Sequence, residues 1–203
     1  MKILKRMIPL FLLLVLAFSL CACGTVSTAE AENYSDDVAA FSEDSVPEGQ
    51  PQPIDTEKQS IDTGKKGTCT LLVECGTILD NMEKMNKDKV KIVPEDGIIF
   101  AEKEVSFYEG ESVFDVLKRE MLDNKIHFEF EWTPLYDSSY VKGIANIYEF
   151  DCGELSGWTF SVNDWFPNYG ASRYIVSQGD RIVWSYTCDC GKDVGADDSM
   201  TTE

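Results

Sequence analysis

The cysteines are the residues of this chain whose side chains could form covalent bonds. Beyond the two near the N-terminus, five follow: Cys69, Cys75, Cys152, Cys188 and Cys190. In an exported chain, disulfides are the default chemistry of such residues. On one extended strand Cys69 and Cys75 would lie roughly 20 Å apart, too far to bond, and Cys188 and Cys190 would close a strained ring. We expect bonds between these groups, with Cys75, Cys152 and Cys188 as candidates and one thiol left over.

Acid–base and metal chemistry find little support in the sequence. His127 is the single histidine and falls on the polar parity of an alternating stretch. No nucleophile-elbow, zinc-protease or phosphate-loop motif occurs. A cysteine zinc site lacks the C-x-x-C spacing, and the acidic tail (Asp189, Asp193, Asp197 and Asp198) lacks the EF-hand spacing for calcium. We expect a protein that is not an enzyme and holds no metal or cofactor, with a solvated acidic tail.

Aromatic side chains gather in residues 156–170, SGWTFSVNDWFPNYG. Trp158, Phe160 and Val162 share one parity and are expected in the core. The next residues do not fit one strand face, because four large side chains bracket a proline. Aromatic rings on a fixed loop suit a flat partner. The predicted ligand contacts are therefore Trp165, Phe166, Pro167, Asn168 and Tyr169; the alternative is a loop folded over the sheet edge.

The N-terminus has the pattern of an export signal. A basic start precedes the apolar run MIPLFLLLVLAFSL, which is too short for a comfortable membrane span. Leu20-Cys21-Ala22-Cys23-Gly24 resembles a bacterial lipobox and predicts a lipid on Cys23, with ordinary cleavage near Ala22 as the alternative. Residues 1–22 are then a lipoprotein signal peptide, and the mature protein is tethered to the extracellular face of the cell membrane.

The rest of the chain divides into a linker and one domain. Residues 23–66 are acidic, rich in Pro, Ser, Thr and Gly and poor in large apolar side chains, which predicts a lipid-anchored disordered linker. Residues 67–203 have the length of a single domain with an acidic tail. The formal net charge of −18 argues against nucleic acid and anionic lipid surfaces as partners.

The order of elements predicts the fold class. Strands are expected at 68–75 and 104–108, with a Pro94–Gly97 turn between them. A helix starts at Ser112, whose pairing with Asp115 resembles a capping box, and ends near Asn124. Strands follow at 126–132, 140–150 and 158–163, and then a hairpin of 174–176 with 182–186. Two strands, one helix and further strands predict an α+β fold: a β-grasp-like sheet packed on one main helix, preceded by the signal peptide and disordered linker.

Several blocks of the sequence resemble a known family. GTILDNM, VPEDGII, EGESVFDVLKRE, FDCGELSGWTFSVN, PNYGASRY and GDRIVWSYTCDCGKDVG occur in order over roughly residues 67–197 and resemble the DUF4430 family of Gram-positive surface proteins. That family is similar to the C-terminal β domain of the cobalamin carriers transcobalamin and intrinsic factor. In those carriers the β domain closes over one face of the corrin ring, and a helical barrel absent from this sequence holds the other.

The resemblance implies a binding role. It extends the predicted ligand contacts to Ser161, Gly170 and Tyr174, and it implies cobalamin or a related corrinoid as the ligand. The expected function is a membrane-tethered extracellular lipoprotein that binds a small ligand by its aromatic loop. The alternatives are a protein-interaction or structural module of cell-surface assembly, whose partner is a second surface protein, and a cation-binding surface domain.

Overall fold

A computed structural model describes residues 46–196, which belong to one compact unit, Ser45–Glu203. The predicted signal peptide and Cys23 lie outside these residues. Within 46–196, no helix is long and apolar enough to cross a membrane. The strands are β1 (Asp62–Glu74), β2 (Ile98–Glu109), β3 (Phe128–Thr133), β4 (Ser138–Ile144), β5 (Ile147–Tyr148), β6 (Gly157–Val162) and β7 (Arg181–Thr187). The helices are α3 (Gly76–Leu79), α4 (Val113–Asp123) and the single 3₁₀ turns η2 (Thr56–Lys58), η3 (Val90–Ile92), η4 (Pro134–Tyr136), η5 (Ala171–Arg173) and η6 (Lys192–Val194).

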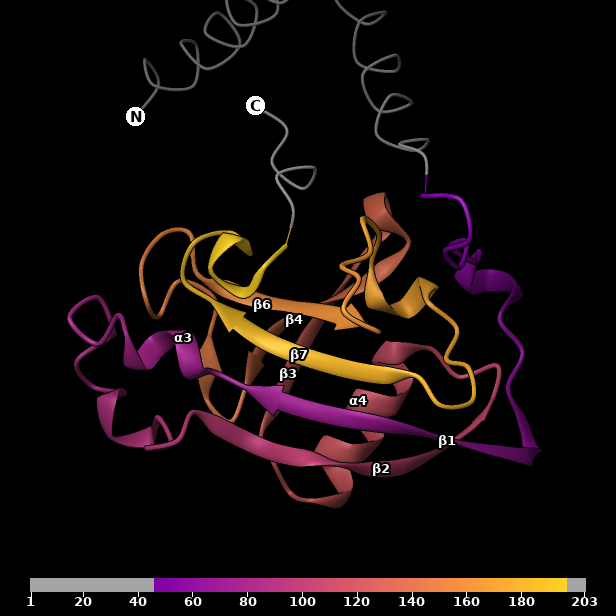
Figure 1. Ribbon diagram of the computed structural model, residues 1–203, viewed down its shortest axis with the longest axis horizontal. Coiled ribbons are helices and arrows are strands. Elements are labelled where there is room, and N and C mark those ends of the chain that lie inside the picture. The colour runs from indigo at the N-terminus through magenta and orange to yellow at the C-terminus, as the bar shows by residue number, and fades with distance from the viewer. Residues whose placement is uncertain (1–45, 197–203) are drawn as a thin grey trace, which may run out of the picture. The chain divides into compact units, whose positions relative to one another are not determined.

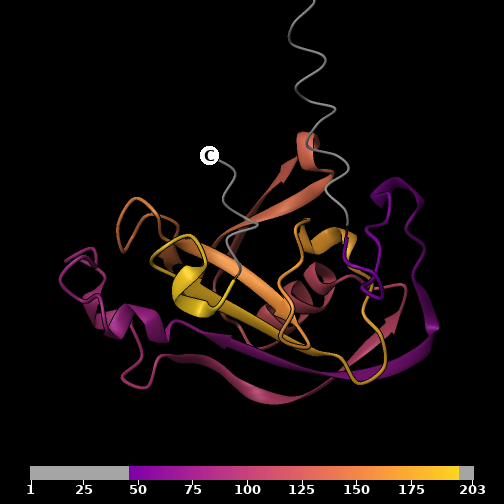
Figure 2. The same cartoon turned by 45° about the horizontal axis from the view of Figure 1, so that its top comes forward.

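The strands form two sheets on either side of the main helix. The four-stranded sheet has the order β2-β1-β7-β6, in which β1 and β7 run parallel and the outer pairs antiparallel. The three-stranded sheet has the order β3-β4-β5. Figures 1 and 2 show α4 and the three-stranded sheet on the same side of the larger sheet. A central parallel pair flanked by antiparallel strands and packed on one helix confirms the β-grasp-like α+β fold.

Helix α4 forms where local chemistry predicts it. The Ser112 side chain accepts from the Asp115 backbone N–H, and the Asp115 carboxylate accepts from the Ser112 N–H, which completes the capping box. The helix ends at Asp123, with Asn124 as its C-cap. Its buried stripe comprises Val113, Phe114, Val116, Leu117 and Met121. This stripe is the reason the helix packs between the two sheets.

Cross-strand aromatic pairs make up much of the core under β6 and β7. Trp158 lies opposite Tyr186, with ring centroids 5.2 Å apart, and Phe160 stacks on Trp184 at 5.3 Å. Val162 lies opposite Ile182. All of these side chains are buried, so the prediction that Trp158, Phe160 and Val162 belong to the core is confirmed.

The predicted hairpin at the C-terminal end is wrong. The turn exists, since Asp180 N–H donates to the Ser177 carbonyl and the Asp180 carboxylate accepts from Ser177 N–H. Residues 174–176, however, form only an isolated bridge at Ile175, to Ser112. Strand β7 instead pairs with β1 on one edge and β6 on the other, which leaves it no free edge for residues 174–176.

The domain begins earlier in the chain than residue 67. Strand β1 starts at Asp62, and the preceding residues 46–61, here called the N-terminal strap, lie against the domain. Tyr169 Oη donates to the Pro51 carbonyl at 2.6 Å, and Ile54 exchanges two hydrogen bonds with Arg173, at 3.0 and 2.9 Å. Gln59 Nε2 reaches the Gly110 carbonyl at 2.9 Å. The C-terminal half of the predicted linker is therefore part of the fold, held by polar contacts that leave no periodic pattern in the sequence.

Candidate ligand-binding site

The aromatic loop at residues 165–169 folds back onto the domain. Trp165 and Val162 exchange backbone hydrogen bonds at 2.9 and 3.0 Å, which close the turn at Asn163 and Asp164. The Trp165 and Tyr169 rings lie 6.0 Å apart, and each is 6.3 Å from the Tyr174 ring. These three rings pack on one another and on the core. This arrangement is that of the alternative expectation, a loop folded over the sheet edge.

The predicted ligand contacts are mostly covered in this arrangement. Asn168 alone among the eight is exposed; Trp165, Phe166, Tyr169 and Gly170 are half-buried, and Ser161, Pro167 and Tyr174 are buried. Gly170 lies so close to Ser138 that an added Cβ would sit 2.0 Å from its Oγ atom. The loop is thus brought together as a packing cluster, and its part in ligand contact stays a prediction.

A different set of aromatic side chains lines an open groove. Tyr140 comes from β4, Phe150 and Leu155 from the β5–β6 loop (residues 149–156), and Trp158 from β6. The groove has a volume of about 280 Å³, and its remaining lining residues are Glu154, Ser156, Gly157, Thr159, Thr187, Cys190, Gly191 and Ala196. Phe150 is 64% exposed and Leu155 54% exposed, although both side chains are large and apolar. We call this feature the aromatic groove.

The backbone presents Phe150 to solvent at some cost. Its φ of +65° lies in the left-handed region, where a bulky residue is uncommon. Its N–H donates to the Ser156 carbonyl at 2.9 Å, which closes the base of the β5–β6 loop. A mostly exposed aromatic side chain buries little apolar area in the folded domain, and backbone strain of this kind concentrates at functional sites.

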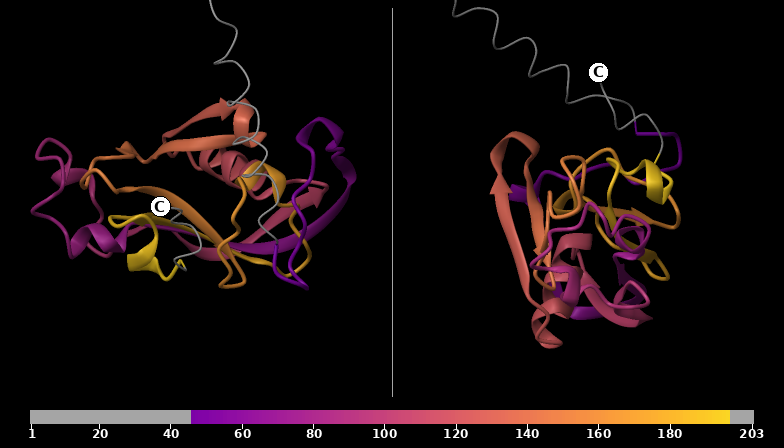
Figure 3. Two further views of the ribbon diagram at one scale, coloured as in Figure 1. Left: turned by 90° about the horizontal axis from the view of Figure 1, so that it is seen from above. Right: turned by 90° about the vertical axis from the view of Figure 1, so that its left-hand side faces the viewer.

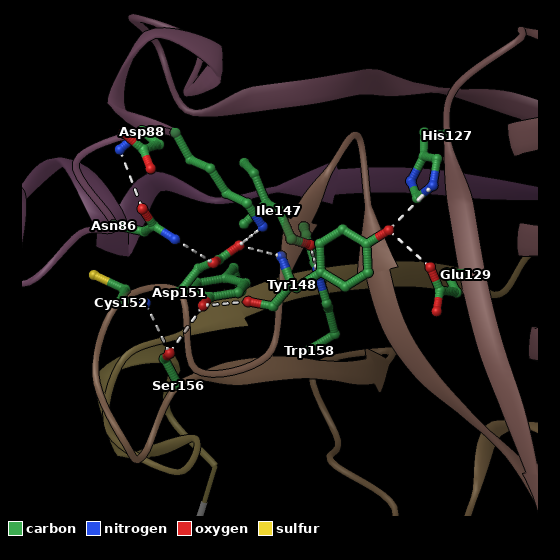
Figure 4. A network of polar contacts seen from close by, with 12 residues as sticks. Asn86, Asp88, His127, Glu129, Ile147, Tyr148, Asp151, Cys152, Ser156 and Trp158 are labelled. Atoms are coloured by element: carbon green, nitrogen blue, oxygen red, sulfur yellow. Dashed lines mark hydrogen bonds and ion pairs between the residues drawn. The ribbon is translucent and has the colours of Figure 1, made fainter.

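A polar network fixes the β5–β6 loop in place (Figure 4). The buried Asp151 carboxylate accepts from the Tyr148 N–H at 2.7 Å and from Lys89 Nζ at 2.6 Å, and Asn86 N–H donates to its backbone carbonyl at 2.7 Å. The Trp158 indole N–H donates to the Ile147 carbonyl at 2.9 Å. The groove wall is therefore rigid on the side where Phe150 projects.

Outer ends of the same network lie on the three-stranded sheet. The Tyr148 hydroxyl donates to Glu129 at 2.7 Å and lies 3.3 Å from Nε2 of the exposed His127. The hydrogen bond to Glu129 raises the pKa of Tyr148, and burial together with Glu149 raises the pKa of Tyr140. Both phenols stay protonated, so they act as hydrogen-bond donors and supply no base near the groove.

A second hollow, of about 450 Å³, lies between the N-terminal strap and the start of α4. Its lining residues are Ile54, Asp55, Lys58, Gln59, Ser60, Gly110 and Ile175. It contains no aromatic ring, so it is the weaker candidate for a flat ligand.

Comparison with known proteins supports the family assignment. Residues 110–188 match the family described as "Domain of unknown function (DUF4430)". Residues 110–188 are thus similar to DUF4430 domains. That segment begins at the Gly110 turn before α4 and ends at Cys188 after β7, so the central strand β1 and its hairpin partner β2 lie before it. No curated protein matches the chain.

Two solved structures match part of the chain. The crystal structure of haptocorrin in complex with Cbi matches with 13% identity and a TM-score of 0.44, over 63% of this chain and 26% of that chain. A Ruminococcus gnavus protein described as a candidate metal binding protein matches with 15% identity and a TM-score of 0.35, over 60% of this chain and 96% of that chain. The present chain thus corresponds to about a quarter of haptocorrin.

Most residues of the aromatic groove lie inside the DUF4430 segment, including Tyr140, Phe150, Leu155 and Trp158. Sequence analysis missed the first three as a group. Phe150 and Leu155 stand in the block FDCGELSGWTFSVN that resembles the family, but a short irregular loop has no period that separates outward from inward side chains. A large apolar residue next to Asp-Cys-Gly in a turn was the available signal.

The structure describes the disulfide candidates and the first two aspartates of the acidic tail, Asp189 and Asp193. Cys75, Cys152 and Cys188 are buried free thiols, as is Cys69, whereas Cys190 is exposed. Asp193 accepts hydrogen bonds from the Thr187 hydroxyl and the Cys188 N–H and so folds the turn after β7. Within residues 46–196, no three His, Cys, Asp or Glu side chains are grouped to hold a metal ion; Asp197 and Asp198 lie outside the described residues.

Proposed function

We propose that this protein is a surface-tethered binding protein, and not an enzyme, that captures a small molecule with a flat apolar face in the aromatic groove. The observation that carries the proposal is the exposure of Phe150 and Leu155 on a rigid loop beside an open hollow. By contrast, the aromatic rings on β6 and β7 are covered, because they pack against one another in pairs. Rings held on a fixed frame lose little conformational entropy on binding, which favours affinity.

A corrinoid is the first ligand to test, since DUF4430 proteins resemble the β domains of cobalamin carriers. The groove volume of about 280 Å³ is far below the size of such a ligand, so the domain would cover one edge or face of it. A half-covered ligand forgoes much of the burial that drives tight binding. We therefore expect micromolar or weaker affinity for the isolated chain, and tighter binding only with a second domain.

The groove is tested by replacing Phe150 with asparagine. Asparagine tolerates the left-handed backbone at this position, so Phe150→Asn removes the ring without loss of folding stability. Loss of a central aromatic contact costs about 2 kcal/mol of binding free energy. We expect the Kd for cobalamin, followed by calorimetry and by the visible spectrum of the ligand, to rise about 30-fold.

Leu122→Gln is the matched control, because Leu122 is 62% exposed on α4 and does not line the groove. This variant should bind like the parent. No heat and no spectral change at millimolar cobalamin would rule out the corrinoid. Equal affinities of Phe150→Asn and the parent would instead move the site away from the groove.

The tether is a separate part of the proposal. If a lipid on Cys23 holds the protein, Cys23→Ala should release it from cells into the medium, because acyl burial supplies about 0.8 kcal/mol per methylene. Immunoblots of cell and medium fractions give the readout. A variant that stays with the membrane at unchanged size indicates an uncleaved N-terminal helix.

A protein-interaction role is the second candidate, and the β3–β4 hairpin favours it. Trp132, Leu135 and Tyr136 near the hairpin turn are 47%, 64% and 57% exposed. Figures 2 and 3 show the hairpin at the edge of the domain, beyond α4. Exposed aromatic side chains are enriched at protein interfaces, and Phe150→Asn should leave such an interface intact.

A further inference from the structure

Two buried thiols meet at the base of the β5–β6 loop. The Cys152 and Cys188 side chains lie near each other, and each shifts the pKa of the other: the Cys188 thiol lowers the pKa of Cys152, and the Cys152 thiol raises that of Cys188. Both also reach the segment at and just after α3: Cys152 Sγ is 3.5 Å from the Asn81 carbonyl, and Cys188 Sγ is 3.7 Å from Thr77 Oγ1. Both residues belong to the buried core, at 0% and 7% exposure.

Hydrogen bonds join the segment that carries Cys152 to the segment that carries Cys188 at two places near the thiols. Cys190 N–H donates to the Leu155 carbonyl at 2.9 Å. On the other side, the Tyr186 hydroxyl is 2.8 Å from Ser156 Oγ, which in turn accepts from the Cys152 N–H at 3.0 Å. The fold thus holds the two segments that carry Cys152 and Cys188 side by side.

The other cysteines lack this arrangement. Cys69 lies within β1, opposite Val105 of β2. It is six residues before Cys75, which follows the end of the strand. Cys190 is exposed. Cys75 is buried, but among the described residues no hydrogen bond of its side chain ties it to the segment just after α3, which both Cys152 and Cys188 contact.

We propose that Cys152 and Cys188 form a disulfide that joins the β5–β6 loop to the end of β7 in the exported protein. The oxidant is the disulfide of an exported thiol–disulfide oxidoreductase or of a small-molecule disulfide. One cysteine thiolate attacks that disulfide, forms a mixed disulfide and releases one oxidant thiol. The second cysteine then attacks the cysteine sulfur of the mixed disulfide and releases the other oxidant thiol. Two protons and two electrons pass to the oxidant, and one S–S bond forms in the protein.

Burial decides when this bond forms. Desolvation raises the pKa of Cys188 to about 12 and also raises the pKa of Cys152. Since the thiolate is the nucleophile, the folded dithiol reacts slowly at neutral pH. Oxidation therefore takes place while the chain folds after export, and a chain folded in a reducing cytoplasm keeps both thiols.

The pairing is tested on the full chain exported from bacterial cells, with free thiols alkylated before lysis. Trypsin places Cys152 and Cys188 in different peptides, because Arg173 and Arg181 lie between them. We expect one cross-linked peptide pair, about 2 Da lighter than the sum of the two reduced peptides. Fragment spectra, or the Cys190→Ser variant, distinguish Cys188 from Cys190. Separate alkylated peptides, or a Cys75–Cys188 pair, would overturn the proposal.

Thermal melts give a second readout that does not depend on peptide recovery. The bond closes a loop of roughly 37 residues, so its reduction should lower the Tm of the detergent-solubilised full chain by about 10 °C. The double variant Cys152→Ala/Cys188→Ala should melt at one temperature with and without dithiothreitol. Cys69→Ala removes an equally buried thiol and should keep the full decrease in Tm on reduction.

A double variant whose Tm still falls with dithiothreitol would contradict the pairing. This proposal does not rest on ligand binding, and cobalamin affinity does not enter either readout.

Discussion

Trp158→Ala is expected to lower the free energy of unfolding of the 46–203 fragment by about 3–5 kcal/mol, the cost typical of truncating a buried tryptophan. The side chain is 7% exposed and packs edge-on against Tyr186. The substitution opens a cavity under β6 and also leaves the Ile147 carbonyl without its indole donor. Urea unfolding followed by circular dichroism measures the change as a lower midpoint at similar slope.

Trp158→Phe separates packing from hydrogen bonding at this position. Phenylalanine keeps one aromatic ring in the core and loses the donor to Ile147 with part of the indole ring, which should cost about 1–3 kcal/mol. Trp158→Ala must then be the more damaging of the two. If the free energy of unfolding of Trp158→Ala is within about 0.5 kcal/mol of the parent value, the cross-strand aromatic pairs do not hold β6 on β7. The aromatic groove then lacks the rigid frame proposed for it.

Much of the fold follows from local patterns. Ser112, Asp115 and the apolar stripe of α4 act within a few residues of each other, so the helix and its ends could be predicted. The alternation of Trp158, Phe160 and Val162 likewise predicts which face of β6 is buried. Such signals depend on backbone geometry that repeats along one segment.

Features set by distant segments escaped prediction. Residues 174–176 have the composition of a strand, but β7 finds its partner in β1, more than one hundred residues earlier. The aromatic loop was predicted as a ligand contact, with a loop folded over the sheet edge as the alternative, and nothing in its own sequence shows that Tyr169 reaches Pro51. Phe150 and Leu155 face outward because Asp151 and Ser156 pin a short loop inward. Their exposure follows from that tertiary anchoring.

Removal of the N-terminal strap is expected to destabilise the domain by several kcal/mol, although the strap is polar and lies in the predicted linker. A fragment that starts at residue 67 loses the hydrogen bonds of Pro51 and Ile54, those of Gln59, and the part of β1 before Gly67. Five hydrogen bonds at about 0.5–1.5 kcal/mol each give a net loss of about 2.5–7.5 kcal/mol.

Part of that loss falls on α4. Gln59 Nε2 donates to the Asp115 carboxylate at 2.7 Å, the same group that closes the capping box with Ser112. Without the strap the helix keeps its cap but loses the outer donor that positions it. The 67–203 fragment should therefore show a lower urea midpoint than the 46–203 fragment, together with faster amide exchange at the first turn of α4.

Tyr169→Phe in the 46–203 fragment is the graded comparison, because it removes only the hydrogen bond to Pro51 and keeps the ring against Trp165 and Tyr174. It should cost about 1 kcal/mol, well below the loss on truncation. Equal midpoints for the two fragments would place the strap outside the folded unit. In that case the aromatic loop would be uncovered in the shorter chain without penalty, and its predicted role in ligand contact would become the stronger reading of residues 165–169.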